Sequence, residues 1–333
     1  MTTFIVAVLV FGILVLFHEF GHFSVAKLVG IKVHEFAIGM GPKIISYKGQ
    51  ETRYSVRILP IGGYVKMEGE DEKSSDERSF NNKPLWARLG VIIAGPLMNF
   101  VLAVIVFSTI SYSVGFATTV VAEATKDLPA YKAGLKSGDK IIAINDKKVR
   151  TWDEIVKNIS ESKDDIKISY ERNDKSEHVY ITPAVNKEDN RRIIGISPKI
   201  EKSIIKSIEN SFDRIIFIIG EMFSFFSRLF GGKASASEVV GPVGIIHLVG
   251  EAAKTNIYNV LFLTGLISIN LGMVNLLPIP ALDGGRIIFL LFEAINGKPL
   301  DPDKEGMIHF TGFVLLMGLM IFMVWKDLGR FVF

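Results

Sequence analysis

The sequence predicts a polytopic α-helical membrane protein with about four transmembrane helices, a β-hairpin element after the first of them and an inserted α+β domain. The 333 residues are 49% hydrophobic, with a mean hydropathy of +0.34, which is too apolar for an ordinary soluble protein. The apolar residues also gather in runs long enough to cross a hydrocarbon core about 30 Å thick, and a stretch of soluble composition separates these runs.

The first apolar run, about residues 4 to 26, contains the sequence HEFGH. Positions four apart lie on one face of an α-helix, so His18 and His22 can present two imidazole nitrogens to a single zinc ion. Glu19 is then placed to take a proton from a metal-bound water. The alternative is two histidines in helix packing and one snorkelling acid. An unpaired carboxylate at mid-bilayer costs roughly 3 kcal/mol or more, which favours the functional interpretation.

The same run resembles the apolar region of a secretory signal. However, no Lys or Arg precedes it, no small-residue cleavage site closes it, and the run continues through HEFGH. We therefore expect residues 1–32 to form a retained first transmembrane helix.

Residues 33–88 are expected to form a cytoplasmic β-hairpin loop and linker. β-type residues alternate with polar ones around Tyr54 and Val56, and Gly- and Pro-containing turns interrupt the pattern. Eleven basic residues lie between the first two spans. The positive-inside bias therefore places this loop in the cytoplasm and the N-terminus outside, so the histidines of the first helix lie towards the cytoplasmic half of the membrane. A sheet beside a protease site would offer an edge strand to an extended peptide; a sheet that merely covers the protein is the alternative.

The second transmembrane helix is expected over residues 89–115. Gly95, Pro96 and Asn99 lie inside this apolar run. Such residues are tolerated in membrane helices when neighbours satisfy the backbone, so spacing alone assigns them no chemistry.

Residues 116–200 have the composition of a soluble α+β domain. Short strand patterns alternate with one helix that a Thr151/Glu154 capping box opens. The string AGLKSGD, residues 133–139, resembles a PDZ domain, and a generic small α+β domain is the alternative. Residues 201–256 follow, where apolar positions at helical spacing are interrupted by charges; they predict an amphipathic interfacial helix and a loop.

The third transmembrane segment, residues 257–285, ends in NLLPIPALDGG. Pro278 and Pro280 break the helix, and irregular backbone at membrane depth is tolerated only where it is buried in protein or lines a wet cavity. Asp283 is therefore the best candidate for a third zinc ligand, with an Asx turn or helix N-cap as the alternative. Residues 286–333 are expected to form a connecting segment and the fourth transmembrane helix.

Composition limits the chemistry further. Cysteine is absent, which excludes disulfides, thiolate zinc sites and a cysteine nucleophile, so His, Asp or Glu must hold any metal. The net charge is +3 and basic residues are scattered among acids, so no nucleic-acid partner is indicated.

Taken together, these motifs resemble the site-2 protease family, in particular the bacterial RseP type of intramembrane zinc metalloprotease. HEFGH matches the family's HExxH, NLLPIPALDGG matches its NxxPxPxLDG, and residues 94–99 and 241–244 match further family strings. The resemblance covers nearly the whole chain and includes one PDZ-like domain between the second and third spans. The best-described member carries two, so gating inferred from two domains is not carried over.

The resemblance implies a zinc metalloendopeptidase that cleaves transmembrane segments, with anti-sigma factors, other single-pass proteins or signal peptides as substrates. It implies a location in the plasma membrane, contact with the lipid bilayer, an active site towards the cytoplasmic side and an extracytoplasmic PDZ-like domain. It also implies a membrane-associated hairpin beside the site. An inactive PDZ-bearing scaffold and a transporter are the alternatives. The implied roles are Zn2+ binding by His18, His22 and Asp283, acid/base catalysis by Glu19, and substrate binding by Asn270 and Asn275.

Overall fold

The computed structural model describes residues 2–70, 74–162, 164–185, 191–232, 240–298 and 300–331. The chain divides into two compact units, one formed by Met1–Ile110 with Ile208–Phe333 and the other by Ser111–Ser207. Within the described ranges, four helices are long and apolar enough to cross a membrane, which confirms the predicted number. They are α1 (Thr2–Leu28), α2 (Leu85–Val114), α7 (Ile257–Asn275) and α9 (Pro302–Phe331).

These four helices carry large apolar side chains on their outer surfaces. Phe4, Leu97 and Phe313 are 67%, 56% and 51% exposed, respectively. Hydrocarbon chains solvate such exposed apolar side chains well, whereas water does not. The exposed surface therefore agrees with the hydropathy of the helices.

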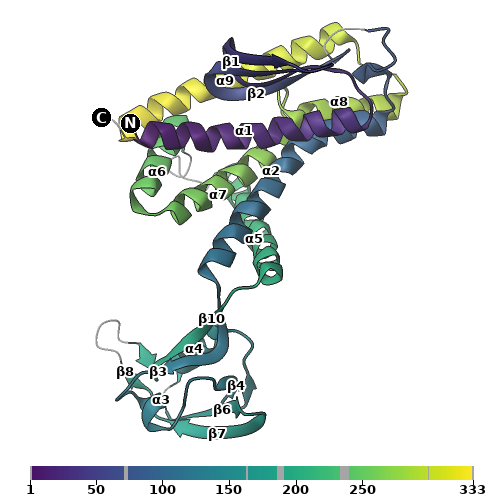
Figure 1. Ribbon diagram of the computed structural model, residues 1–333. Helices are drawn as coiled ribbons and strands as arrows, with labels where there is room; N and C mark the ends of the chain where they lie inside the picture. Colours follow the sequence, from purple (N-terminus) through teal and green to yellow (C-terminus); the bar gives the residue numbers. More distant parts are fainter. Residues whose placement is uncertain are drawn as a thin grey trace. The chain divides into compact units, whose positions relative to one another are not determined.

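The hairpin runs from Val33 to Met67, within the residues 33–88 where it was expected, as strand β1 (Val33–Lys48) and strand β2 (Arg53–Met67). Residues 35–38 of β1 each have two partners, one in 53–56 and one in 63–66. Residues 63–67 pair with β1 on one side only, so they form an edge of this sheet. The sheet lies alongside α1 (Figure 1).

Ion pairs of Glu35 with Lys43 and Arg57 join segments of the hairpin. Burial raises the pKa of Glu35, but hydrogen bonds from Ser55, Arg57 and Lys43 outweigh this effect and hold the pKa at about 2. The Glu35 carboxylate is therefore charged at neutral pH and links segments that are far apart along the hairpin.

Apolar packing joins the hairpin and the helices around α1. Ile31, Val91 and Leu290 belong to one core cluster, which connects the end of α1 with the hairpin, α2 and α8 (Asp283–Asn296). Leu14 and Val249 belong to a second cluster, which connects α1 with α2, α7 and α6 (Pro242–Thr255). The helix that carries HEFGH is thus held along its length.

Helix α5 (Ile204–Phe230) covers the stretch predicted as an amphipathic helix. It packs on α2 and α7 around Phe107 and Ile215, and the Arg214 guanidinium carbon lies 5.7 Å from the Phe107 ring centroid. Its interfacial position stays a prediction. Residues 233–239 of the loop that was expected after it lie outside the described ranges.

The second unit contains a β-sheet with the strand order β10-β3-β4-β6-β7. The short strand β5 pairs with β4 outside this order. Its core contains Ile141, Ile155 and Ile168. Thr151 caps α4 by accepting a hydrogen bond from the Glu154 N–H at 3.3 Å, as the capping box predicts. The elements are β3 (Phe116–Ala124), α3 (Pro129–Lys132), β4 (Lys140–Ile144), β5 (Lys147–Lys148), α4 (Trp152–Glu161), β6 (Ile166–Arg172), β7 (Lys175–Ile181), β8 (Ala184–Val185), β9 (Arg192–Ile193) and β10 (Ile196–Glu201).

The acid at the end of the AGLKSGD string has a structural role in this unit. Asp139 is 1% exposed and accepts two hydrogen bonds of 2.6 Å from Arg172 and one of 2.8 Å from the Lys136 N–H. Arg172 also donates to the Gly134 carbonyl at 2.9 Å. These bonds close the loop onto β6, and the bonds to Asp139 raise the pKa of Arg172.

Candidate metal centre

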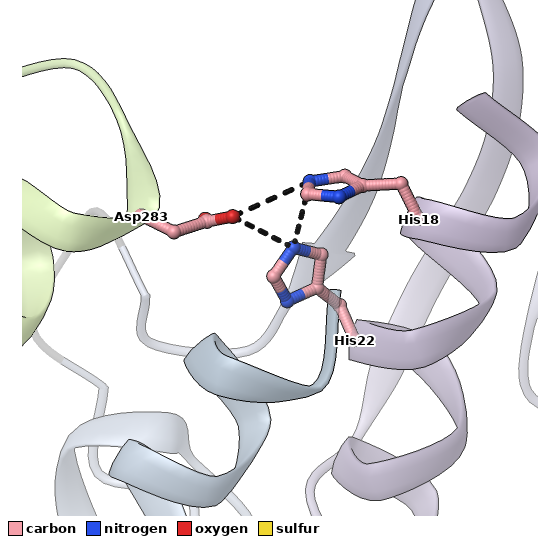
Figure 2. A group of neighbouring side chains, drawn as sticks. All are labelled: His18, His22 and Asp283. Atoms are coloured by element: carbon pink, nitrogen blue, oxygen red, sulfur yellow. Dashed lines mark hydrogen bonds and ion pairs between the residues drawn. The ribbon is translucent and has the colours of Figure 1, made fainter. Parts of the chain in front are cut away.

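Three side chains from two distant parts of the chain converge in the first unit. His18 and His22 lie one turn apart on α1, and Asp283 is the first residue of α8 (Figure 2). The two Nε2 atoms are 3.3 Å apart, and the Asp283 Oδ2 atom lies 3.3 Å from Nε2 of His18 and 3.6 Å from Nε2 of His22. The structure thus brings together all three residues that the sequence proposed as zinc ligands.

The geometry of this group fits a zinc ion. Ligand atoms that bind zinc at about 2.0–2.1 Å with tetrahedral angles lie about 3.3 Å from one another, close to the three separations observed. Asp283 Oδ2 is buried and has no hydrogen-bond partner among the described residues. Two imidazoles and one carboxylate form a donor set that zinc enzymes use, and this set leaves a fourth coordination position for water or substrate.

Helix α2 orients the second histidine. His22 Nδ1 lies 2.8 Å from the Val91 carbonyl oxygen. Because a carbonyl only accepts, Nδ1 carries the proton and the Nε2 lone pair faces the group. A Cβ atom at Gly95 would lie 2.2 Å from His22 Nε2, so glycine leaves the space that the ring occupies. Neither contact was predicted, because a backbone carbonyl and an absent side chain produce no recognisable pattern of residues in the sequence.

The loop before α8 orients Asp283. The N-cap of α8 is Leu282, and Asp283 is directed at the two histidines rather than at the helix backbone, so the N-cap alternative does not describe it. Ala281 has a φ of 74°, and its N–H donates to His309 Nδ1 on α9 at 3.0 Å. Further along α8, Glu293 accepts a hydrogen bond of 3.0 Å from Arg88 on α2. The loop before α8 is therefore bonded to α9, and α8 itself is bonded to α2.

Glu19 contacts the hairpin. Its side chain is partly buried, and a Cβ atom at Gly63 would lie 2.8 Å from Glu19 Cγ. Gly63 belongs to the edge formed by residues 63–67. The acid of HEFGH is thus adjacent in sequence to His18 and in contact with a sheet edge.

The two asparagines that family resemblance proposed for substrate binding are not part of the three-residue group. Asn270 and Asn275 are partly buried on α7, and neither side chain forms a hydrogen bond within the described part of the chain. A third asparagine was missed. Asn99 on α2 is 0% exposed, and its Nδ2 atom lies 3.1 Å from His18 Nδ1.

Comparison with known proteins adds independent information. The profile of peptidase family M50 matches residues 6–319. The zinc metalloprotease RasP of Geobacillus kaustophilus is 35% identical over 408 residues, which cover 97% of this chain and 97% of that protein. The regulator of sigma-W protease RasP of Bacillus subtilis is 33% identical over 416 residues, which cover 98% of each. A solved PDZ domain of an SdrC-like protein from Listeria monocytogenes is 27% identical and covers 25% of this chain and 88% of its own, with a TM-score of 0.23.

Proposed function

The chain belongs to peptidase family M50, the site-2 protease family that the motifs predicted, and is a zinc metalloprotease; from this premise we propose that it cleaves peptide bonds within membrane-spanning segments of other proteins. The observation that carries the proposal is the group of His18, His22 and Asp283, whose histidines project from a helix of membrane-spanning length and hydropathy. Soluble substrates can hardly reach catalytic residues on such a helix, whereas segments within the bilayer reach them directly.

We assign the zinc to His18, His22 and Asp283. When bound there, zinc supplies a Lewis acid that lowers the pKa of a coordinated water to about 7 and polarises the scissile carbonyl. Glu19 accepts a proton from the attacking water and passes it to the amine that leaves as the C–N bond breaks. Asn270 and Asn275 hold the substrate backbone, a role that rests on the family resemblance alone.

The hairpin edge is the element proposed to hold the substrate. A peptide bond in a helix is shielded by the helix's own hydrogen bonds, so a transmembrane substrate must unwind before it is cut. Residues 63–67 pair on one side only and contact Glu19 through Gly63, so an unwound segment that pairs with this edge lies next to the base. Helix-breaking residues in the substrate then favour cleavage.

The name of the Bacillus subtilis relative, a regulator of sigma-W protease, supports single-pass anti-sigma factors as one substrate class, beside signal peptides. We place the protein in the plasma membrane, with the site towards the cytoplasm and the Ser111–Ser207 unit, proposed to be PDZ-like, outside. The unit contributes no residue to the metal group, so we assign it a role in filtering access rather than in chemistry.

Cysteine labelling tests this topology, since the native chain has no cysteine. Ser75 and Ser176 are both exposed, one after the hairpin and one in the second unit. An impermeant external thiol reagent added to intact cells is expected to label Ser176→Cys and to leave Ser75→Cys unlabelled until the cells are opened, because basic residues hold the loop inside. Labelling of Ser75→Cys in intact cells would reverse the proposed orientation.

The proposed activity is tested with the purified chain in lipid vesicles and a single-pass protein whose transmembrane segment contains a Gly-Pro pair. Mass spectrometry is expected to locate the cut inside that segment. Chelation of zinc should stop cleavage and added zinc should restore it, whereas Glu19→Gln should not cleave under either condition. Cuts confined to the soluble flanks, or cleavage indifferent to chelation, would refute the proposal.

A further inference from the structure

Asn99 is a buried polar side chain that contacts the metal group and that the proposed mechanism leaves without a role. It lies on α2, is 0% exposed, and approaches His18 Nδ1 with its Nδ2 atom at 3.1 Å. Its Oδ1 atom is buried and has no hydrogen-bond partner among the described residues. Its main-chain carbonyl accepts a hydrogen bond of 2.7 Å from the Ser268 side chain on α7.

The observed contact belongs to one of the two neutral forms of His18. An amide nitrogen donates, so His18 Nδ1 accepts, and in the neutral ring the proton then lies on Nε2, the atom that faces Asp283. A zinc ion needs the opposite form, in which Nε2 has a free lone pair and Nδ1 carries the proton. Two donors would then face each other across 3.1 Å.

A half-turn of the Asn99 amide resolves this conflict. The amide oxygen and nitrogen occupy nearly the same volume, so the half-turn brings Oδ1 to His18 Nδ1–H without displacing the backbone. Because Oδ1 holds no other donor in the described structure, the half-turn gives up no hydrogen bond to a third residue.

Helix α2 would then serve both histidines in the same way. Val91, Gly95 and Asn99 are spaced four apart and form one stripe on this helix. Val91 accepts from Nδ1 of His22, Gly95 leaves room for the His22 ring, and Asn99 contacts Nδ1 of His18. The carbonyl can only accept, whereas the amide can serve His18 in either form.

We infer that Asn99 is a positioning residue for zinc: its side-chain oxygen holds the proton on His18 Nδ1 and so directs the Nε2 lone pair at the metal. The inference rests on the zinc site assigned under the proposed function. It concerns only how one ligand is oriented, and zinc affinity measures it without reference to proteolysis.

The test is the zinc affinity of the purified full-length chain, measured by competition with a fluorescent chelator, for Asn99→Leu and Asn99→Asp. Leu has nearly the shape of Asn but accepts no hydrogen bond, so it is expected to raise the zinc Kd about 10–100-fold. Asp keeps the acceptor and is expected to bind zinc at least as tightly as Asn. A role in packing alone predicts the reverse order, because Leu fills the site whereas Asp buries a charge.

Two further variants keep the result interpretable. Ser268→Ala removes the bond to the Asn99 main chain without touching His18, and it should leave the zinc Kd unchanged. Asn99→Ala serves as a second acceptor-free variant where Asn99→Leu does not fold, as judged by thermal unfolding of the zinc-free proteins. The inference is overturned if a folded Asn99→Leu or Asn99→Ala protein binds zinc with the wild-type Kd. It is also overturned if Asn99→Asp binds zinc as weakly as Asn99→Leu.

A parallel His18→Ala variant separates this inference from the proposed function. If His18→Ala weakens zinc binding but the Asn99 variants do not, the assigned zinc site stands and only the role of Asn99 fails. If His18→Ala binds zinc as the wild type does, the assigned ligands are wrong and both proposals fall.

Discussion

Glu19→Gln is expected to lower the rate of intramembrane cleavage about a thousandfold or more while the protein keeps one zinc per chain. Gln retains almost the same shape as Glu but accepts no proton, and a general base contributes about 10²–10⁴-fold to such reactions. Glu19 is not among the three residues whose ligand atoms converge, so its loss should not release the metal. Single-turnover cleavage and zinc analysis of the same preparation measure both effects.

The matched control is Glu209→Gln, the same chemical change at an exposed position on α5. It should leave both rate and zinc content unchanged. Loss of zinc from a folded Glu19→Gln protein would make Glu19 a ligand rather than the base. A cleavage rate within tenfold of the wild type would remove it from the chemistry.

Asp283→Ala is expected to cause the largest loss of metal affinity. It removes the charged oxygen and leaves His18 and His22 alone to hold the ion, which should then be lost on dialysis against a moderate chelator, together with all cleavage. Asp283→Asn keeps an uncharged oxygen at the same place and should fall between the wild type and Asp283→Ala. Zinc retained per chain after dialysis measures the series.

A second buried carboxylate in the same unit provides the control. Asp327 on α9 is 1% exposed and accepts hydrogen bonds from the N–H groups of Gly241 (3.2 Å) and Gly244 (2.8 Å) at the start of α6. Asp327→Asn should lower the melting temperature without changing zinc retention. If Asp283→Ala retained zinc as fully as Asp327→Asn, the third ligand would lie elsewhere.

Local periodicity was enough to predict part of the site. His18 and His22 are four apart, and the helical repeat places them on one face whatever surrounds them. Asp283 was predicted from a different signal, a proline-broken segment followed by an acid at the end of an apolar run. The absence of cysteine then restricted the donor types, so three ligands could be proposed before any packing was known.

The remaining part of the site depends on contacts between helices, which the sequence does not encode locally. Every residue type carries a backbone carbonyl like that of Val91, and Gly95 acts by leaving space for the His22 ring. Neither contact therefore has a distinctive sequence signal. Asn99 lies in a string that matched the family, but only the crossing of α1 and α2 places it at His18. Residues 286–296, expected to belong to a connecting segment, lie in helix α8, which begins at Asp283.

The hairpin illustrates the same limit within a β-element. Alternation around Tyr54 and Val56 predicted a strand there, and both residues lie in β2. It did not predict that residues 35–38 would pair on both sides, because register over such a long hairpin depends on turns and on side-chain links such as Glu35 to Arg57. That register is what leaves residues 63–67 as the edge beside Glu19.

X-ray absorption at the zinc K-edge of the purified protein measures whether His18, His22 and Asp283 hold one zinc ion. We expect a four-coordinate shell of nitrogen and oxygen atoms at about 2.0–2.1 Å with outer-shell scattering from two imidazole rings. The scattering from one ring should disappear in His18→Ala. A wild-type spectrum with no imidazole scattering, or a spectrum unchanged by His18→Ala, would show that these residues do not hold the zinc.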